Sequence, residues 1–261
     1  MKRVLTIAGS DSSAGAGIQA DLKVFAQLGV YGMSAVTAVT AQNSRGVQKI
    51  YKVAPKIVAA QIDSVVRDIG ADACKIGMLY SPQVVDLVAE RIERRDIKNV
   101  VVDPIVFAKD GTRLLSARAV SRMINDLLPR ATLVAPNVAE AELLSGIKVT
   151  DPQSAAMAAE QISKFGPDYV LIKGGHLDGE PIDVLFDGQS AREYRGERVA
   201  GPPMRGTGCA LTAAIAALLA QGHSVQDAVA FAKQFVASAI AHAVKLGKGK
   251  VSFYTGTQGE G

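Results

Sequence analysis

The chain has 261 residues, of which 48% are hydrophobic and 21% are charged, a composition typical of a globular protein with a substantial core and not of a disordered one. Its net charge of +4 comes from lysines and arginines scattered along the sequence, without the basic stripe and interleaved aromatic residues of a nucleic-acid-binding protein. The two cysteines are too few for a disulfide scaffold.

The first residues and the longest apolar stretch bear on where the protein resides. Met1-Lys2-Arg3 leads directly into the apolar run 4–8, so no signal peptide is expected. The longest apolar stretch, 209–220, has about a dozen residues, whereas a transmembrane helix needs ~20. We therefore expect a cytoplasmic protein that neither spans a membrane nor binds nucleic acid.

Short apolar runs alternate along the chain with segments of helical spacing. The runs typical of buried strands are residues 4–8, 34–40, 73–76, 100–102, 132–135 and 169–173. The segments typical of helices are residues 18–28, 55–69, 82–94, 116–128, 209–220 and 224–245. Ser81 and Pro82 mark the start of the third helix. Asp187-Gly188 predicts a hairpin between 182–186 and 191–194.

This alternation predicts an α/β fold in three layers, in which a mainly parallel central sheet is covered by helices on both faces. Without an internal repeat or a Pro/Ser-rich linker, we expect a single domain over residues 1–261, with the Gly-rich segment 256–261 as a flexible tail. Ligands bind beyond the carboxyl ends of the strands in such sheets. Polar residues and glycines gather there, at Gly9-Ser10-Asp11, Gln42-Asn43, Gly77-Met78, Asp103-Pro104, Asn137 and Lys173-Gly174-Gly175.

The turn Gly206-Thr207-Gly208-Cys209 precedes an alanine-rich helix. Its glycines let backbone N–H groups turn toward one point, and the helix dipole adds positive potential there. Such an anion hole suits the charge that develops on a transferred phosphoryl group. Cys209 falls in the first helical turn, where the pKa of a thiol is lowered. The alternative is a glycine-capped turn with Cys209 as a small core residue.

The Gly-rich loop 9–17 matches neither G-x-G-x-x-G nor the P-loop pattern, but it lets a ligand approach the backbone closely. Asp21, in the helix that follows, is close enough to face such a ligand. The alternative is a plain loop followed by a surface aspartate.

Two further groups of residues have both a functional and a structural interpretation. Asp103 and Glu140 could hold Mg²⁺ through oxygen or water ligands, while Asn137 and Glu140 have the spacing of a capping box, and both can be true. Lys173, beside two glycines and ahead of His176, could meet phosphate or could be a solvated lysine in a turn. His223 and His242 have no partners at metal-ligand spacing, so structural roles are expected.

Taken together, these motifs resemble the hydroxymethylpyrimidine/phosphomethylpyrimidine kinases of thiamine biosynthesis, within the ribokinase-like superfamily. The resemblance extends over almost the whole chain. Its marks are residues 15–23 (Gly-Ala-Gly-Ile-Gln-Ala-Asp-Leu-Lys), 37–43 (Thr-Ala-Val-Thr-Ala-Gln-Asn), Lys75-Ile76-Gly77-Met78, Pro136-Asn137 with Glu140-Ala141, Lys173-Gly174-Gly175-His176 and Gly206-Thr207-Gly208-Cys209.

The resemblance implies a ribokinase-like fold and the use of ATP and Mg²⁺. It implies phosphorylation of 4-amino-5-hydroxymethyl-2-methylpyrimidine and then of its monophosphate, by a homodimer. The family's pyrimidine-binding positions correspond to Gly9, Asp21, Gln42, Met78 and Val106. Gln42 offers a donor and an acceptor to an aminopyrimidine edge, and Asp21 would accept from the amine or the hydroxymethyl group.

The resemblance also implies roles at the phosphate end. ATP would lie near Lys173, Asn137 and Thr207, with Gly206, Thr207, Gly208 and Cys209 as the catalytic turn, while Asp103 and Glu140, supported by Asn137, would hold Mg²⁺ and its waters. On this basis, replacing Cys209 with alanine should lower kcat far more than it raises the KM for ATP.

The chain departs from the family pattern at two places, and two other functions remain as alternatives. Many ribokinase-like sugar kinases have an aspartate base where Cys209 stands, whereas the pyrimidine kinases have cysteine. Arg205 replaces a common histidine, and Ser12-Ser13 stands where proline is frequent; Arg205 could contact phosphate or be a surface charge. The alternatives are a pyridoxal/pyridoxine kinase of the same fold and a non-catalytic ligand-binding protein.

Overall fold

The fold is taken from a computed structural model of the chain. The structure describes residues 1–108, 111–175, 180–197, 204–241, 243, 246–249 and 251–252. The expected tail 256–261, His176, His242 and the end of the last expected helix lie outside the described residues.

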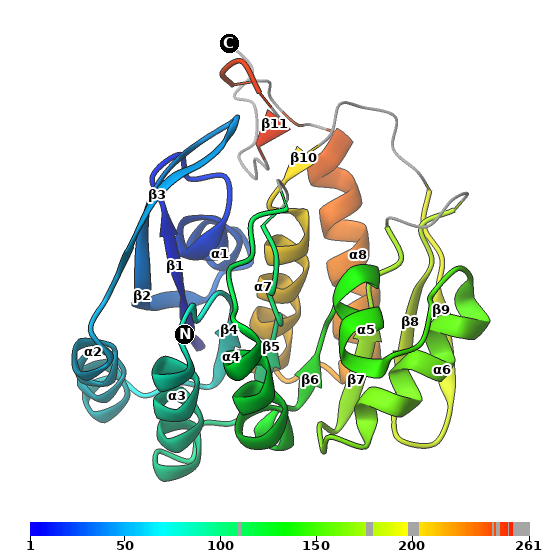
Figure 1. The fold of residues 1–261 in the computed structure, drawn as a ribbon, viewed down its shortest axis with the longest axis horizontal. Coiled ribbons are helices and arrows are strands. Elements are labelled where there is room, and N and C mark those ends of the chain that lie inside the picture. The colour runs from blue at the N-terminus through cyan, green and yellow to red at the C-terminus, as the bar shows by residue number, and fades with distance from the viewer. Residues whose placement is uncertain are drawn as a thin grey trace.

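Within the described residues, a nine-stranded sheet of order β3-β2-β1-β4-β5-β6-β7-β8-β9 forms the centre (Figure 1). Its strands are β1 Arg3–Asp11, β2 Tyr31–Asn43, β3 Gly46–Lys52, β4 Ala73–Ile76, β5 Val100–Val102, β6 Leu133–Val134, β7 Tyr169–Ile172, β8 Asp183–Phe186 and β9 Ala191–Tyr194. In this order, the neighbouring strands β2, β1, β4, β5, β6 and β7 pair in parallel. The strands at the two edges, β3 on one side and β8 and β9 on the other, pair antiparallel. The sheet is therefore mainly parallel, as predicted.

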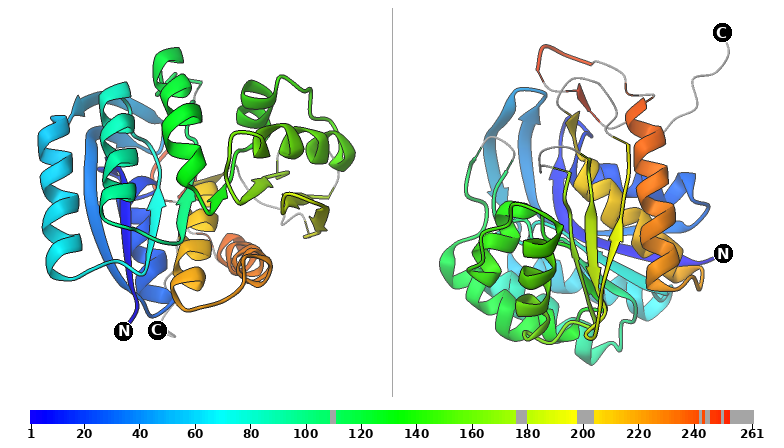
Figure 2. Two further views of the ribbon diagram at one scale, coloured as in Figure 1. Left: turned by 90° about the horizontal axis from the view of Figure 1, so that it is seen from below. Right: turned by 90° about the vertical axis from the view of Figure 1, so that its right-hand side faces the viewer.

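The helices lie on both faces of the sheet (Figure 2). They are α1 Gly17–Gln27, α2 Pro55–Asp68, α3 Pro82–Arg94, α4 Ala117–Arg122, α5 Val138–Ser145, α6 Pro152–Ser163, α7 Thr207–Ala220 and α8 Val225–Ala241. Helices α2 to α6 pack on one face, and α1, α7 and α8 pack on the other. Because side chains alternate along a strand, Leu5 and Ile7 of β1 point to the first face and Val4 to the second. The predicted three-layer α/β fold is confirmed.

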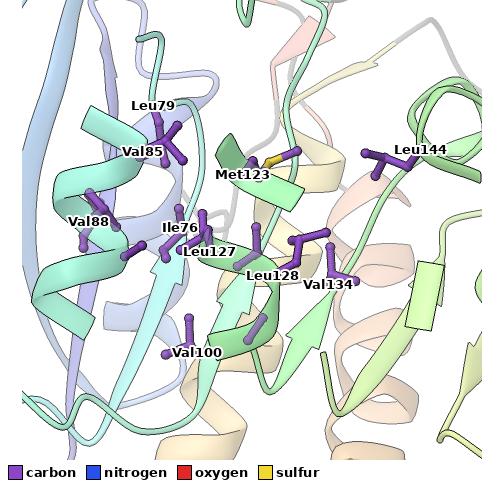
Figure 3. Close-up of a cluster of buried hydrophobic side chains, with 14 of the residues drawn as sticks. Ile76, Leu79, Val85, Val88, Val100, Met123, Leu127, Leu128, Val134 and Leu144 are labelled. Atoms are coloured by element: carbon purple, nitrogen blue, oxygen red, sulfur yellow. The ribbon is translucent and has the colours of Figure 1, made fainter. Parts of the chain in front are cut away.

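Local sequence signals explain several helix boundaries. Ser81 caps α3, because its hydroxyl accepts a bond from the Val84 N–H at 3.3 Å, and Pro82 takes the first position. The predicted bounds of α3 and of β4 agree with the structure. Under α3 and α4, side chains from the sheet and helices, including Ile76, Val88 and Leu127, form a continuous apolar layer (Figure 3).

The structure differs from the sequence prediction in several elements, among them β3, α6 and the helix expected over 116–128. Strand β3 was not predicted because it lies at the sheet edge, where most of its side chains are at least partly exposed and give no apolar run. Helix α6 was not predicted either. The helix expected over 116–128 passes at Met123–Leu127 into a π-helical turn and then a short 3₁₀ turn, Leu128–Arg130. Pro129 lacks an N–H and cannot continue an α-helix there.

Helix α7 is buried around its whole circumference, since α1, α8 and the sheet surround it. This explains its uniform apolar sequence. Across the ranges that the structure covers, no helix has the length and apolar character needed to span a membrane.

Candidate active site

A pocket of about 190 Å³ opens where β1, β4, β5, β6 and β7 end at their carboxyl sides. Most of the residues singled out in the sequence line it, namely Gly9, Gln42, Met78, Asp103, Asn137, Glu140, Lys173, Gly206, Gly208 and Cys209. They come from segments that are far apart in the sequence and meet because parallel strands end at one edge. Among the residues to which the sequence analysis assigned no site role, Lys75, Ile105 and Phe107 also line it.

Three predicted site residues do not line this pocket: Asp21, Val106 and Thr207. Val106 is fully buried in the core, and its neighbour Ile105 faces the pocket instead. Thr207 begins α7, so its backbone N–H is one of those without a partner within the helix. Asp21 is fully buried behind the pocket wall.

The start of α7 has the geometry of an anion site. Its N-cap, Gly206, has φ +82°, a left-handed conformation that glycine adopts without strain. Among the described residues no side chain caps the helix, and the Ala210 N–H donates to the Gly206 carbonyl at 2.8 Å. The N–H groups of residues 207–209 come before this bond and have no partner within the helix. They lie at the positive end of the helix dipole, beside the pocket.

Lys173 places a positive charge next to this turn. Its Nζ lies 2.6 Å from Asp103 Oδ1, and a Cβ added at Gly208 would lie 3.5 Å from the same Nζ. Burial alone would lower the pKa of Lys173, but the carboxylates of Asp103 and Glu140 raise it. Lys173 is therefore a largely buried, charged ammonium and not a solvated lysine in a turn.

Glu140 combines the two interpretations left open by the sequence. Its Oε2 accepts from the Asn137 N–H at 2.9 Å, while Asn137 Oδ1 accepts from the Glu140 N–H at 3.0 Å, so the predicted capping box is confirmed. Glu140 also lines the pocket although it is only 2% exposed. Burial, reinforced by the Asp103 charge and opposed by Lys173, raises the pKa of Glu140 to about 7.

The donor set is compatible with Mg²⁺ but not with a closed metal cage. Within the described residues, no group of three or more His, Cys, Asp or Glu side chains could hold a metal ion. Asp103 and Glu140 nevertheless line one pocket and supply the hard oxygen ligands that Mg²⁺ prefers. An ion bound through one or two carboxylates, with water and phosphate oxygens as its other ligands, fits this pair.

The raised pKa of Glu140 predicts a pH-dependent stability. Between about pH 4.5 and 7 the folded protein retains a proton that the unfolded chain releases, so this contribution is fully present below pH 4.5 and is lost as pH rises to 7. Relative to Glu140→Gln, the wild-type chain should lose roughly 1–3 kcal/mol of unfolding free energy between pH 5 and 8. Urea unfolding of both proteins without Mg²⁺ measures this difference. Parallel pH profiles would contradict the assignment.

Cys209 differs from the expectation of a lowered pKa. The side chain is 9% exposed, and burial raises the pKa of its thiol. Asp103 and Asp21 raise it further, while Lys75 and a bond from the Gly17 N–H act in the opposite direction. The lowering of the thiol pKa by the helix N-terminus is thus outweighed by the raising of that pKa through burial. The thiol therefore stays protonated at neutral pH.

An unpredicted ion pair lies beneath the pocket. Lys75 Nζ donates to both carboxylate oxygens of Asp21, at 3.0 and 2.9 Å, and the Thr6 hydroxyl donates to Asp21 Oδ2 at 2.6 Å. The side chains of Lys75 and Asp21 are both fully buried. Asp21 is therefore not a surface aspartate, because its side chain is buried and its oxygens accept from Lys75 and Thr6. The sequence contained one signal for this ion pair: a lysine, Lys75, inside the otherwise apolar four-residue strand 73–76.

Arg205 is not a surface charge, and its guanidinium is already paired with a carboxylate of the protein. It is 6% exposed, and its Nη2 donates to Asp11 Oδ2 at 2.8 Å. Near it, Ser12 fixes the backbone of Gln42: the Ser12 hydroxyl donates to the Gln42 carbonyl at 2.8 Å and accepts from the Gln42 N–H at 2.9 Å. This loop thereby holds Gln42 at the pocket.

Comparison with known proteins identifies the family. A family model described as phosphomethylpyrimidine kinase matches residues 11–253. The hydroxymethylpyrimidine/phosphomethylpyrimidine kinase of Streptomyces coelicolor is 47% identical over 246 residues, which cover 94% of this chain and 91% of that protein. The bifunctional thiamine-biosynthesis protein of Geobacter sulfurreducens is 45% identical over 94% of this chain, which spans 50% of that longer relative.

A solved structure extends the comparison to the fold. The pyridoxal kinase from Staphylococcus aureus in complex with ADP superposes with a TM-score of 0.92 at 37% identity, covering 100% of this chain and 95% of the other. The ribokinase-like fold that the sequence motifs implied is confirmed. Since the family model matches residues 11–253 and the relatives match most of the chain, this chain belongs to the phosphomethylpyrimidine kinase family.

Proposed function

We propose that this chain transfers the γ-phosphoryl group of ATP to 4-amino-5-hydroxymethyl-2-methylpyrimidine, and then to the monophosphate of that alcohol, in thiamine biosynthesis. The observation that carries the proposal is the composition of one pocket. The same pocket is lined by Gln42 and Met78, which suit a flat aminopyrimidine. It is also lined by Lys173 and by the turn at the start of α7, residues 206–209, which we call the phosphate-binding turn. An alcohol and a triphosphate can therefore approach each other in it.

The mechanism follows from charge and position. Charge spreads over the oxygens of the transferred group in the transition state, so catalysis depends on orientation and neutralisation. The N–H groups of residues 207–209 donate to these oxygens, and the Lys173 ammonium adds positive charge. Mg²⁺, when held by Asp103 and Glu140 directly or through water, supplies further neutralisation at the phosphates.

Gln42 orients the acceptor in this proposal. Its amide offers one acceptor oxygen and two donor hydrogens, which complement the ring nitrogen and exocyclic amine of an aminopyrimidine. Gln42 Oε1 also lies 3.1 Å from the Thr40 hydroxyl, and Ser12 fixes its backbone, so the side chain and the backbone of Gln42 are each restrained by a neighbour. Met78 and Ile105 add apolar surface for the ring.

Cys209 contributes through its backbone and packing in this mechanism. Because its thiol is protonated, Cys209→Ala should lower kcat by less than about 100-fold, the lower range for loss of a general base. The pH profile of kcat between pH 6 and 9 should keep its wild-type shape. Steady-state kinetics across this range test the prediction. Loss of a titration step in the variant would instead make the thiol a proton carrier.

Pyridoxal is the second candidate acceptor, because the ADP-bound structure that superposes at TM-score 0.92 is a pyridoxal kinase. The identity of 47% to a pyrimidine kinase, against 37% to this pyridoxal kinase, favours the pyrimidine. The test is a coupled assay of ADP release with each alcohol, with the product identified by mass. Higher kcat/KM with pyridoxal would reverse the assignment, and no ADP release with either alcohol would indicate a non-catalytic ligand-binding protein.

A homodimer, a cytoplasmic location and a single functional domain are further parts of the proposal. Val39 and Tyr51, which are paired across β2 and β3 at the edge of the sheet, are exposed apolar side chains and support a dimer surface, and light scattering should give twice the mass of one chain. Unpaired Cys74 and Cys209 fit a reducing compartment. The continuous sheet across β1 to β9 supports one domain.

A further inference from the structure

Arg205 joins the two sides of the pocket through a buried ion pair. Its Nη2 lies 2.8 Å from Asp11 Oδ2, and the two residues, 194 positions apart in the sequence, are 6% and 3% exposed. Its Nη1 donates to the Asn43 carbonyl and lies 3.3 Å from the Ser13 hydroxyl. Both terminal nitrogens therefore donate to protein oxygens, at the end of β1, on the loop that follows it and at the end of β2.

On the acceptor side, Asp11 organises the loop that leads to α1. Its Oδ1 accepts from the Ser13 N–H at 2.9 Å, and its Oδ2 accepts from the Gly15 N–H at 3.2 Å. The loop then passes Gly17, which lines the pocket and whose backbone N–H lowers the pKa of the Cys209 thiol. A Cβ at Gly17 would lie 2.3 Å from the Gly9 carbonyl oxygen, so the loop has little room to shift.

On the phosphate side, Arg205 directly precedes Gly206, the N-cap of α7. It lies in the short strand β10, Met204–Arg205, which pairs in parallel with β11, Val251–Ser252. The partner of Met204, Val251, is 2% exposed. The entry to the phosphate-binding turn is therefore fixed by a strand pair and by the Arg205 side chain.

We propose that Arg205 is a positioning residue that does not itself bind ATP. Through its ion pair with Asp11, it holds the turn 206–209, at the phosphate end of the pocket, in a fixed position relative to the loop 9–17, at the acceptor end. This inference assumes one part of the proposed function, that the pocket performs phosphoryl transfer. It does not depend on which alcohol is the acceptor. Such transfer depends on placing the acceptor and the phosphoryl group within bonding reach, and displacement by about 1 Å costs on the order of 100-fold in rate. The ion pair directly links Arg205, which precedes the start of α7, to Asp11, which precedes the loop that leads to α1.

Four variants test this proposal by kinetics. Arg205→Met should lower kcat by about 100-fold and change the KM for ATP by less than about threefold. Arg205→Lys should retain more activity, because its ammonium can reach Asp11 but cannot form the planar fork that also serves Asn43. Asp11→Asn should lower kcat as well. Because the two residues act as a unit, Arg205→Met/Asp11→Asn should be at most about threefold slower than Arg205→Met.

Arg95→Met is the matched control. Arg95 forms a partly buried ion pair with Asp63 at 2.8 Å, linking α3 to α2 away from the pocket. Its loss should change stability but leave kcat within about threefold of wild type. If Arg95→Met lowers kcat as much as Arg205→Met, a general stability effect replaces the positioning role. If Arg205→Met raises the KM for ATP by about tenfold or more while Asp11→Asn leaves that KM unchanged, Arg205 binds nucleotide and the proposal is wrong.

Hydrogen exchange separates this inference from the proposed function, because it requires no substrate. In Arg205→Met, the amides of Ser13 and Gly15, on the other side of the ion pair, should exchange at least about tenfold faster, while those of α2 and α3 should not change. Unchanged exchange at these two amides overturns the positioning role whatever alcohol the enzyme uses. Faster exchange in a protein that phosphorylates neither alcohol would support the link between the loops and overturn only the proposed function.

Discussion

Replacing Lys173 with methionine is expected to lower kcat/KM for ATP by about 100- to 1,000-fold, the usual effect of removing one group that stabilises transition-state charge. The ammonium lies beside Gly208 and is 2.6 Å from Asp103 Oδ1. Methionine removes its positive charge from the phosphate end and leaves the Asp103 carboxylate buried without that partner. Repulsion between this carboxylate and the phosphates then adds to the loss of attraction. Steady-state kinetics with varied ATP measure the effect.

Lys233→Met is a closely matched control for this prediction. Lys233 Nζ lies 2.7 Å from Asp183 Oδ2, and the side chains of this pair are 15% and 8% exposed, against 12% and 4% for Lys173 and Asp103. Lys233 does not line the pocket. Both variants should lose stability, but only Lys173→Met should lose catalysis. If the two variants have equal kcat/KM, the Lys173 charge does not act on the phosphates.

The second large effect concerns folding. Replacing Lys75 with methionine should lower the free energy of unfolding by roughly 3–5 kcal/mol, because it leaves the buried Asp21 carboxylate without its cation. Burial alone would lower the pKa of Lys75, but the charges of Asp21 and Asp103 raise it, so the lysine remains charged. The expected loss is a large part of the ~5–15 kcal/mol that stabilises a typical domain. Urea unfolding at pH 7 measures it.

A double variant distinguishes the cause of this loss. Lys75→Met/Asp21→Leu removes both charges and should recover at least about 2 kcal/mol relative to Lys75→Met, since an apolar pair of similar volume tolerates burial. Lys98→Met is a control, because the Lys98–Asp96 pair is exposed and such pairs contribute little. If the double variant is less stable than Lys75→Met alone, packing and not the uncompensated charge explains the effect.

Local patterns in the sequence predicted the secondary structure where each element depends on its own residues. The Ser81 cap and Pro82 set the start of α3, and the Asn137 and Glu140 spacing gave a capping box that the structure confirms. Apolar strands between helices predicted a mainly parallel, three-layer α/β fold, since only burial on both faces accounts for such strands. The edge strand β3, which has no apolar run, gave no such signal.

The general position of the site was also predictable from the sequence. Polar residues and glycines follow the strands, and parallel strands end at one edge of the sheet, so Gly9, Met78, Asp103 and Lys173 had to lie near one another. What each group does there was not predictable, because it depends on partners brought together by folding. Asp21 pairs with Lys75, 54 residues away, and Arg205 pairs with Asp11.

The sequence by itself therefore determined the architecture, the family motifs and the edge of the sheet where they gather. Only the tertiary structure decided which charges are buried and paired. It placed Asp21 behind the pocket, turned Arg205 toward Asp11, and raised the pKa of the Cys209 thiol where the helix start alone predicted a lower one. The physical reason is that burial and opposite charge are properties of the folded surroundings, which no spacing of residues along the chain contains.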